Sequence, residues 1–222
     1  DITKKNSDFL ENKFLDTDGG KFQTSNSEII DKFNSITGIY ERRYAPDEIN
    51  CSDLAAVAAG LAINDSKLDQ ETLDYIIVAH NTGDISCSSG QVDTLPSVAS
   101  KVKAKLKIKN PNCVAYDIIC GCPGWVEGII QAKSFIKSGM AEKCLVIGCD
   151  TLSRILDEND RDSMIYADGS GAIVLESDSS YDGGILSHKS ATFTYEGEND
   201  FIFYGTSYDC LLYTSPSPRD RG

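Results

Sequence analysis

The feature that most constrains the fold is a regular alternation between short apolar runs and segments with helical spacing. Four apolar runs have the length and composition of buried strands: residues 73–79, 113–119, 143–149 and 171–175. Strands separated by helices form crossover units, in which successive strands run parallel. The chain is therefore predicted to be an α/β protein with a mainly parallel sheet and helices on both faces.

Three helices are predicted, one before the first of these strands and one in each of the next two gaps. The first is capped by Ser52 and has apolar residues at helical spacing, namely Leu54, Val57, Ala58 and Leu61. The second opens at Pro96 and has its apolar face at Val98, Val102 and Leu106. The third opens at Pro123, ends at Gly139 and has its apolar residues at Val126, Ile129, Ile130 and Ile136.

Charge and hydropathy limit the class of partner. Among the 222 residues, 34 are acidic and 21 are basic, which gives a formal net charge of −13. Such a chain repels phosphates, so neither nucleic acid nor an anionic membrane is expected as a partner. No run approaches the roughly 20 apolar residues of a membrane-spanning helix, and no secretory signal is visible. A cytoplasmic location is expected.

The eight cysteines are predicted to be free thiols. Cys113, Cys120, Cys144 and Cys149 lie in apolar, strand-like runs, where cysteine acts as a small hydrophobic residue. The sequence has no C-x-x-C motif and only two histidines, so no metal site is expected. No cofactor is expected either.

Chemistry in parallel sheets gathers beyond the carboxyl ends of the strands. This rule selects four places, which are residues 80–82, residues 120–123, residues 150–151 and the loop before Asp168. The glycines at 169 and 171 are interpreted as an ordinary turn between strands, because no phosphate-binding lysine follows them.

Cys122 is the strongest candidate for a catalytic residue. It lies between Gly121, which permits a tight backbone turn, and Pro123, which suits the first turn of a helix. The positive end of a helix dipole favours the nucleophilic thiolate, and backbone N–H groups of the turn can receive an oxyanion. The alternative is that Cys122 fills space at a crowded turn. Cys120 is interpreted as a packing residue.

Seven separated motifs occur in the order found in the thiolase-like condensing enzymes. They are Thr37-Gly38-Ile39 with Glu41-Arg42-Arg43, Leu95-Pro96-Ser97, Cys122-Pro123-Gly124-Trp125, Ser138-Gly139, Leu145-Val146-Ile147-Gly148, Asp160-Arg161 and Asp168-Gly169-Ser170-Gly171-Ala172. Over about residues 34–176 the chain resembles β-ketoacyl-acyl carrier protein synthase III. The resemblance implies a thiolase-like fold of which only one of two similar halves, the amino-terminal one, is present.

The resemblance also implies an acyltransferase of fatty acid or polyketide-type biosynthesis. Cys122 matches the nucleophile that takes an acyl group from acyl-CoA or an acyl carrier protein before decarboxylative condensation with malonyl-acyl carrier protein. Arg161 and Thr37 match residues of the CoA-binding mouth. Leu95 matches a residue that lines the acyl pocket of the other subunit of a homodimer, and Trp125 stands where phenylalanine is more usual.

Two departures from the family pattern limit this reading. Lys32 and Ile36 stand where the family has a tryptophan and an arginine that hold CoA, so the acyl donor is left open between CoA and the carrier protein. The family's catalytic His and Asn belong to its second half. His80 is either within reach of Cys122 or a polar loop residue, and His188 is expected on a surface strand; neither is assigned as the base.

The ends of the chain depart from this pattern. Residues 210–222 resemble a reading frame of a sequencing adapter, so we expect a natural amino-terminal domain over residues 1–209, incomplete at both ends and without an obvious first strand. The chain made alone is expected to be inactive in condensation and prone to associate.

Other functions remain open at this point. The chain is alternatively a non-catalytic partner of a condensing enzyme, or a thiol-responsive protein that uses Cys120 and Cys122. Arg42 and Arg43 are interpreted as a solvated charge cluster. The alternating lysines at 101–109 are interpreted as an exposed helix end that continues into an extended segment, with binding to an acidic carrier protein as the alternative.

Overall fold

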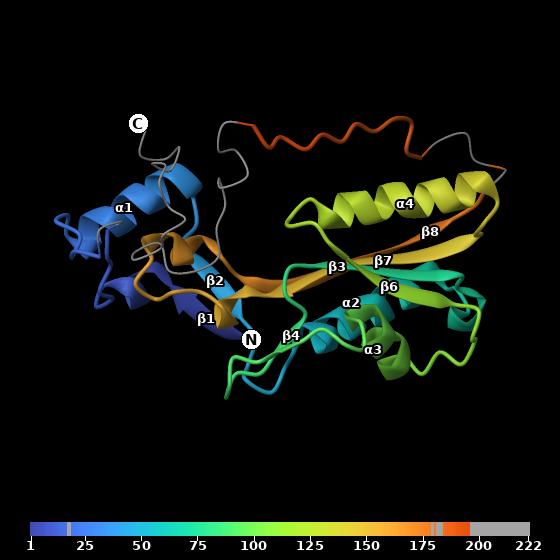
Figure 1. The fold of residues 1–222 in the computed structure, drawn as a ribbon, viewed down its shortest axis with the longest axis horizontal. Coiled ribbons are helices and arrows are strands. Elements are labelled where there is room, and N and C mark those ends of the chain that lie inside the picture. The colour runs from blue at the N-terminus through green and yellow to red at the C-terminus, as the bar shows by residue number, and fades with distance from the viewer. Residues whose placement is uncertain (17–18, 179, 181–183, 196–222) are drawn as a thin grey trace. The chain divides into compact units, whose positions relative to one another are not determined.

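The computed structural model describes residues 1–16, 19–178, 180 and 184–195 (Figure 1). The proposed boundary at Asp209 and the adapter-like segment 210–222 lie outside the described residues. The chain divides into two compact units, which are described separately. The larger is built mainly from residues 44–154 and 168–188, and the smaller mainly from residues 2–43 and 155–167.

A four-stranded sheet forms the centre of the larger unit. Its strands, in spatial order, are β6 (Val114–Ile119), β3 (Tyr75–His80), β7 (Lys143–Thr151) and β8 (Asp168–Glu176). The first three are parallel, and β8 runs antiparallel to β7. All four strands were expected near these positions, and the α/β class with a mainly parallel sheet is confirmed. The start of β8 corrects one interpretation, because the glycines at 169 and 171 lie in a strand and not in a turn.

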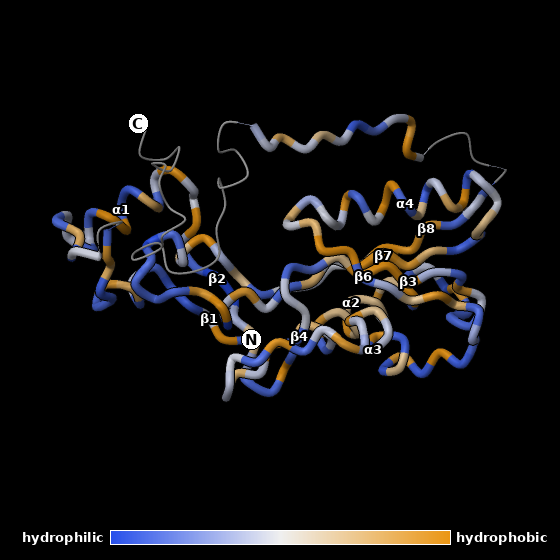
Figure 2. Tube along the Cα trace, viewed as in Figure 1, coloured by the Kyte–Doolittle hydropathy of each residue, from blue (hydrophilic) through white to orange (hydrophobic). Residues whose placement is uncertain are grey.

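Helices cover both faces of this sheet (Figure 1). On one face lies α4 (Gly124–Ser138), and on the other lie α2 (Cys51–Ser66) and α3 (Val98–Lys105). The strands supply both cores by alternation. Ile76 and Val78 pack with α2 and α3, whereas Ile77 packs with α4. Strands buried on both sides need apolar residues at every position, and Figure 2 shows hydrophobic stretches along these strands.

Small residues bring α4 close to the sheet. Gly124, Gly128 and Ala132 recur every four residues and are buried. A Cβ on Gly128 would lie 2.9 Å from Val146 Cγ1, and one on Gly124 would lie 3.1 Å from Ala79 Cβ. The helix ends as predicted at Gly139, whose φ of 76° is the left-handed conformation that glycine adopts most easily.

The sequence prediction for α2 was wrong in two respects. Asn50, not Ser52, is the N-cap, and its backbone N–H donates to the Asp53 carboxylate. The buried face consists of Cys51, Ser52, Ala55, Ala59 and Ile63. Two residues of the predicted core face, Val57 and Leu61, are instead 65% and 66% exposed.

The lysine run includes a helix end as predicted, since α3 ends at Lys105, but three of its lysines have local partners. Helix α3 begins after Ser97 and extends to Lys105, with Val98 and Val102 buried as predicted. Lys101 forms ion pairs with Asp84 and Asp93, which belong to a small hairpin of β4 (Asp84–Ile85) and β5 (Val92–Asp93). Lys101 thus connects α3 to this hairpin.

Lys103 and Lys105 show the same behaviour. Lys103 donates to the carbonyls of Asn110 and Cys113, and Lys105 pairs with Asp53 of α2. The larger unit also contains two short helices, η2 (Gln70–Thr72) and η3 (Leu152–Arg154).

The smaller unit contains elements that the sequence analysis missed. Its elements are β1 (Ile2–Lys5), η1 (Asn6–Phe9), α1 (Asn26–Thr37), β2 (Glu41–Tyr44) and η4 (Arg161–Ile165). The expectation that the chain lacks an early strand was therefore wrong. Helix α1 carries a sequence signal that was overlooked, because Ser25 and Glu28 form a capping box. The core is an aromatic and aliphatic cluster of Phe9, Phe14, Ile29, Ile30 and Met164.

Arg42 belongs to this core and not to a solvated cluster. It is only 4% exposed, donates to Asn6 Oδ1 and the Lys4 carbonyl, and lies over the ring of Phe9. Arg43, in contrast, is exposed and pairs with Glu41.

The described part of the chain holds no helix long and apolar enough to cross a membrane.

Candidate active site

The four places selected from the sequence meet at one edge of the central sheet. Strands β3, β6 and β7 are parallel and end there. Strand β8 begins there, because it is antiparallel and Asp168 pairs with Thr151 at the end of β7. The rule that chemistry lies at the carboxyl ends of strands therefore located this edge correctly, although β8 contributes its amino end to the edge.

The turn from β6 to α4 has the tight geometry that was expected. Gly121 has φ of 67°, a left-handed conformation that disfavours residues with a Cβ. Its carbonyl accepts a hydrogen bond from the Gly124 N–H at 2.9 Å, which closes the turn at the first residue of α4. Cys122 lies inside this turn, directly before Pro123, the N-cap of the helix.

Both cysteines of this turn are exposed and free. The exposure of Cys122 excludes the interpretation that it fills buried space. Cys120 was interpreted as packing, and that interpretation was wrong. Its Cβ lies 3.6 Å from the position that a Cβ on Gly124 would occupy, so Cys120 lies beside the start of α4.

His80 is a buried strand residue, which rules out the alternative of a polar loop residue. It is the last residue of β3, is 2% exposed, and shares the sheet face of Ile76 and Val78, opposite α4. Its Nδ1 accepts the Gly83 N–H at 2.9 Å, so the ring proton is on Nε2, which donates to Asp117 Oδ2 at 2.9 Å. Both ring nitrogens of His80 thus have partners within the larger unit.

Asp117 connects His80 to the start of α3. Its carboxylate accepts the backbone N–H groups of Val98 and Ala99 at 2.7 and 2.8 Å, as well as the His80 proton. Burial raises the pKa of Asp117, but the hydrogen bonds from His80 and from the helix N-terminus outweigh it and hold the pKa below its usual value. No local sequence pattern indicates this interaction, because it joins residues 37 positions apart.

A second carboxylate joins the ends of β3 and β7. Asp150 accepts the Asn81 backbone N–H at 2.8 Å and the Asn81 side-chain amide at 2.6 Å. Burial raises the pKa of Asp150 and exceeds the lowering effect of these hydrogen bonds. Asn81 Oδ1 lies 4.0 Å from where a Cβ on Gly121 would be, so this pair lies beside the cysteine turn.

The other cysteines in strand-like runs are buried, as predicted. Burial raises the pKa of the Cys144 thiol to about 12 and also raises that of Cys113. Cys149 contacts Cys51, with 3.0 Å between the two Sγ atoms, and this contact together with burial raises the pKa of Cys149. Such protonated, buried thiols are chemically inert.

Leu95 and Trp125 belong to the same unit as Cys122. Leu95 is 83% exposed and precedes Pro96 across a cis peptide bond. The ring of Trp125 packs on Gly148 of β7, where an added Cβ would lie 3.2 Å from Cδ1. Its indole N–H is buried without a hydrogen-bond partner. Trp125 therefore anchors the first turn of α4 on the sheet.

Thr37 and Arg161 belong to the smaller unit. Thr37 ends α1; its hydroxyl donates to the Phe33 carbonyl and accepts the Ile39 N–H. Arg161 begins η4 and lies over the Phe22 ring, 4.6 Å from its centroid. Lys32 and Ile36, the two departures from the family pattern, lie on the exposed side of α1.

The remaining candidates have no role at this edge. His188 is exposed as expected, but it lies outside any strand. Asp168 accepts hydrogen bonds from Ala45 and Ser153, which is a structural role. Across residues 1–16, 19–178, 180 and 184–195, no three His, Cys, Asp or Glu side chains gather as possible metal ligands.

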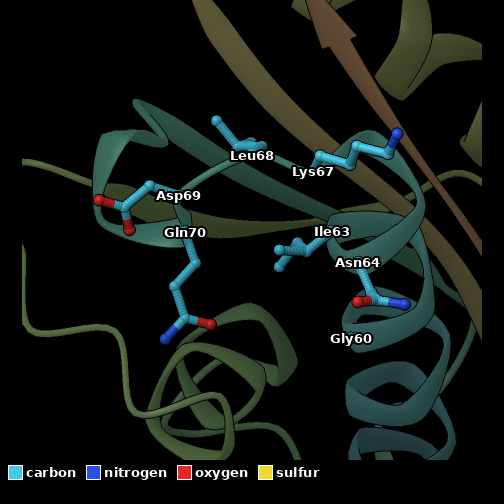
Figure 3. Close-up of a pocket in the computed structure, with 7 residues that line it drawn as sticks. All are labelled: Gly60, Ile63, Asn64, Lys67, Leu68, Asp69 and Gln70. Atoms are coloured by element: carbon cyan, nitrogen blue, oxygen red, sulfur yellow. The ribbon is translucent and has the colours of Figure 1, made fainter.

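A pocket of about 520 Å³ lies elsewhere in the larger unit (Figure 3). It is lined by Gly60, Ile63, Asn64, Lys67, Leu68, Asp69 and Gln70. These residues lie in the last turns of α2 and in the segment between α2 and the amino end of β3, whereas Cys122 follows the carboxyl end of β6. The pocket is thus not part of the cysteine site.

Comparison with known proteins gives one consistent result. The family of 3-oxoacyl-[acyl-carrier-protein (ACP)] synthase III matches residues 116–193. The β-ketoacyl-[acyl-carrier-protein] synthase III of Ehrlichia canis (strain Jake) is 39% identical over 198 residues, which are 86% of this chain and 56% of the relative. That of Neisseria gonorrhoeae (strain NCCP11945) is 44% identical over 140 residues, or 63% of this chain and 41% of the relative.

Solved structures agree with the sequence matches. The 3-oxoacyl-(acyl carrier protein) synthase III of Pseudomonas aeruginosa PAO1 superposes with a TM-score of 0.64 at 28% identity, over 84% of this chain and 50% of that one. The enzyme of Aquifex aeolicus VF5 gives 0.62 at 33% identity, over 80% and 50%. The chain spans about half the length of the relatives it matches. With its thiolase-like fold, it belongs to the β-ketoacyl-[acyl-carrier-protein] synthase III family of condensing enzymes.

Proposed function

We propose that this chain carries the nucleophile of a β-ketoacyl-acyl carrier protein synthase III, and that Cys122 is the residue acylated. The observation that carries the proposal is the position of Cys122. Its thiol is exposed, stands directly before α4, and lies at the edge where the parallel strands end. The names of the relatives support the reaction class and the use of a carrier protein.

In the first step, the Cys122 thiolate attacks the carbonyl carbon of an acyl thioester. A new carbon–sulfur bond forms, the donor's carbon–sulfur bond breaks, and the departing CoA or carrier thiolate takes up a proton. The first N–H groups of a helix lack intrahelical partners, and the helix dipole favours negative charge there. The start of α4 therefore suits the oxyanion of the tetrahedral intermediate.

In the second step, malonyl-acyl carrier protein loses CO₂ as the bond to its carboxylate breaks. The carbanion attacks the acyl carbon, and the Cys122 thiolate leaves. His80 donates to Asp117 and His188 is outside this edge, so neither is proposed to assist. We therefore propose that the chain by itself completes acylation but not condensation.

The remaining site residues are proposed to contact substrate. The guanidinium of Arg161 suits the phosphates and the base of CoA, and Thr37 lies in the same unit. The exposure of Leu95 is compatible with insertion into the second subunit of a homodimer. For Trp125, packing on Gly148 supports an indirect contribution through the position of α4.

The test is acylation of Cys122. The protein is incubated with an acyl-CoA, digested, and analysed by fragment-resolved mass spectrometry. We expect one acyl group on Cys122, sensitive to hydroxylamine as a thioester is. The adduct disappears in Cys122→Ala and persists in Cys120→Ala, which is the matched control in the same turn.

Two results would overturn the proposal. One is the absence of any adduct on a folded protein. The other is an adduct that survives Cys122→Ala.

A further inference from the structure

The cysteine turn contains a second exposed thiol that acyl transfer does not use. Cys120 and Cys122 are separated by one residue, and both are free and exposed. In the described part of the chain, Cys51, Cys113, Cys144 and Cys149 are buried, and Cys87 is the remaining exposed cysteine. Two accessible thiols are thus concentrated at one turn.

The short spacing of the two cysteines along the chain is compatible with a disulfide. Residues two apart span at most about 7 Å between Cα atoms, because consecutive Cα atoms are about 3.8 Å apart. The residue between them, Gly121, has a positive φ, so the chain turns at this point, and the hydrogen bond from Gly124 N to Gly121 O closes the turn that follows. Disulfides form at Cα separations of about 4.4–6.8 Å.

The residue between the two cysteines can adjust to a bridge. Gly121 has no side chain, and an added Cβ would meet nothing closer than 3.7 Å, at Pro123 Cδ. The Cβ of Cys120 lies 3.6 Å from the position that a Cβ on Gly124 would occupy, so Cys120 lies next to the first residue of α4. Cys122 precedes the same residue by two positions.

We propose that Cys120 is a resolving thiol, and that Cys120 and Cys122 form a reversible disulfide that switches the nucleophile off. The proposal rests on the proposed function only for its consequence, the loss of acylation. The bond itself depends on the geometry of the turn.

The oxidant is a low-molecular-weight disulfide. One cysteine thiolate attacks it, forms a mixed disulfide and releases one small thiol. The second cysteine thiolate then attacks the protein sulfur of the mixed disulfide, forms the Cys120–Cys122 bond and releases the second small thiol. The protein loses two electrons and two protons, which are recovered in the two released thiols.

A second sulfur pair in the same unit provides a contrast. The Sγ atoms of Cys51 and Cys149 are 3.0 Å apart, closer than non-bonded sulfurs usually approach. They are 0% and 4% exposed, however, so a dissolved disulfide has no access to them. Because these two cysteines are close together but buried, we expect no reaction between them and a dissolved disulfide.

The experiment uses glutathione disulfide as the oxidant, without any acyl donor. On the wild-type chain we expect the peptide that contains both cysteines to lose two hydrogens and to recover them with dithiothreitol. Cys120→Ser should instead carry one glutathione on Cys122, and Cys122→Ser one glutathione on Cys120. The double variant Cys51→Ala/Cys149→Ala should behave as the wild type does.

Three results would overturn the proposal. The wild-type peptide could carry two glutathiones, or it could stay reduced under conditions that modify Cys120→Ser. The loss of two hydrogens could also persist in Cys120→Ser, which would assign the bond to another pair.

A second measurement separates the proposal from the proposed function. After oxidation the protein is given acyl-CoA before and after dithiothreitol. We expect acylation of Cys122 only after reduction. If the disulfide forms but the protein is never acylated, the disulfide proposal stands and the proposed function is wrong. If the protein is acylated but no disulfide forms, the proposed function stands and the disulfide proposal is wrong.

Discussion

At the scale of single residues, Asp117 has the densest set of interactions near the candidate site. It accepts three hydrogen bonds, from His80 Nε2 and from the N–H groups of Val98 and Ala99. Its side chain is 13% exposed, so solvent screens these bonds only weakly. The carboxylate joins the end of β3, the middle of β6 and the start of α3.

Replacement of Asp117 by Asn is expected to destabilise the protein by roughly 1.5–3 kcal/mol at pH 7, the range for hydrogen bonds to a charged group. Asn keeps the shape but offers one acceptor oxygen to three donors. Urea unfolding of Asp117→Asn measures the loss. Asp65→Asn, at an exposed position of α2, is the control and should change stability little.

The same substitution makes a prediction about pH. Because folding lowers the pKa of Asp117, the carboxylate stabilises the fold fully above the unfolded value of about 3.9. This contribution is lost as the pH falls through the lower folded-state pKa. The difference between wild type and Asp117→Asn should therefore shrink in acid, and a difference that stays constant to pH 2–3 or so would contradict the assignment.

Residues at the site differed in how far the sequence could predict them. The turn around Cys122 was predicted because Gly121 and Pro123 are direct neighbours whose backbone preferences define it. The Asp117–His80 interaction was not foreseeable, because it depends on the pairing of β3 with β6. Cys120 was misassigned, since an apolar run does not show that its last residue leaves the sheet.

At the scale of elements, features set by neighbouring residues were predicted, and features set by tertiary packing were not. Apolar runs predicted all four strands, but not the antiparallel direction of β8. Helix α2 was located correctly and oriented wrongly, because its alanines, valine and leucines are apolar all round and periodicity cannot select a face. Helix α1 was missed although Ser25 and Glu28 carry a capping signal.

The close packing of α4 gives a prediction at this scale. Gly128→Ala gains up to about 1 kcal/mol of helix propensity. Its new Cβ would lie 2.9 Å from Val146 Cγ1, however, and overpacking of this kind costs roughly 1–3 kcal/mol. We expect net destabilisation, measured by denaturant unfolding.

Gly60→Ala is the matched control for Gly128→Ala. Gly60 is also inside a helix, but a Cβ there would meet Leu106 Cδ2 at an ordinary 3.9 Å. The propensity gain should then prevail, and stability should rise or stay unchanged. If Gly128→Ala proved as stable as Gly60→Ala, α4 would not lie as close to the sheet as described.

At the scale of the whole molecule, α2 has a face that nothing in the described chain covers. Its buried side packs on the sheet, while Val57 and Leu61 are 65% and 66% exposed one turn apart. A helix that is apolar all round is normally buried all round. The relatives are about twice as long as this chain, which agrees with a face that the longer proteins cover.

We therefore predict that the chain made alone associates through this face. The double variant Val57→Glu/Leu61→Lys places opposite charges four residues apart, which preserves the helix while it removes the apolar surface. Burial of one such side chain is worth about 1.5–3 kcal/mol, so association should weaken on the order of tenfold or more. Sedimentation over a concentration series measures this. Val126→Lys, on the exposed side of α4, is the control and should leave association unchanged. If both variants weakened association equally, the contact would be unspecific, and α2 would not be the surface through which the chain associates.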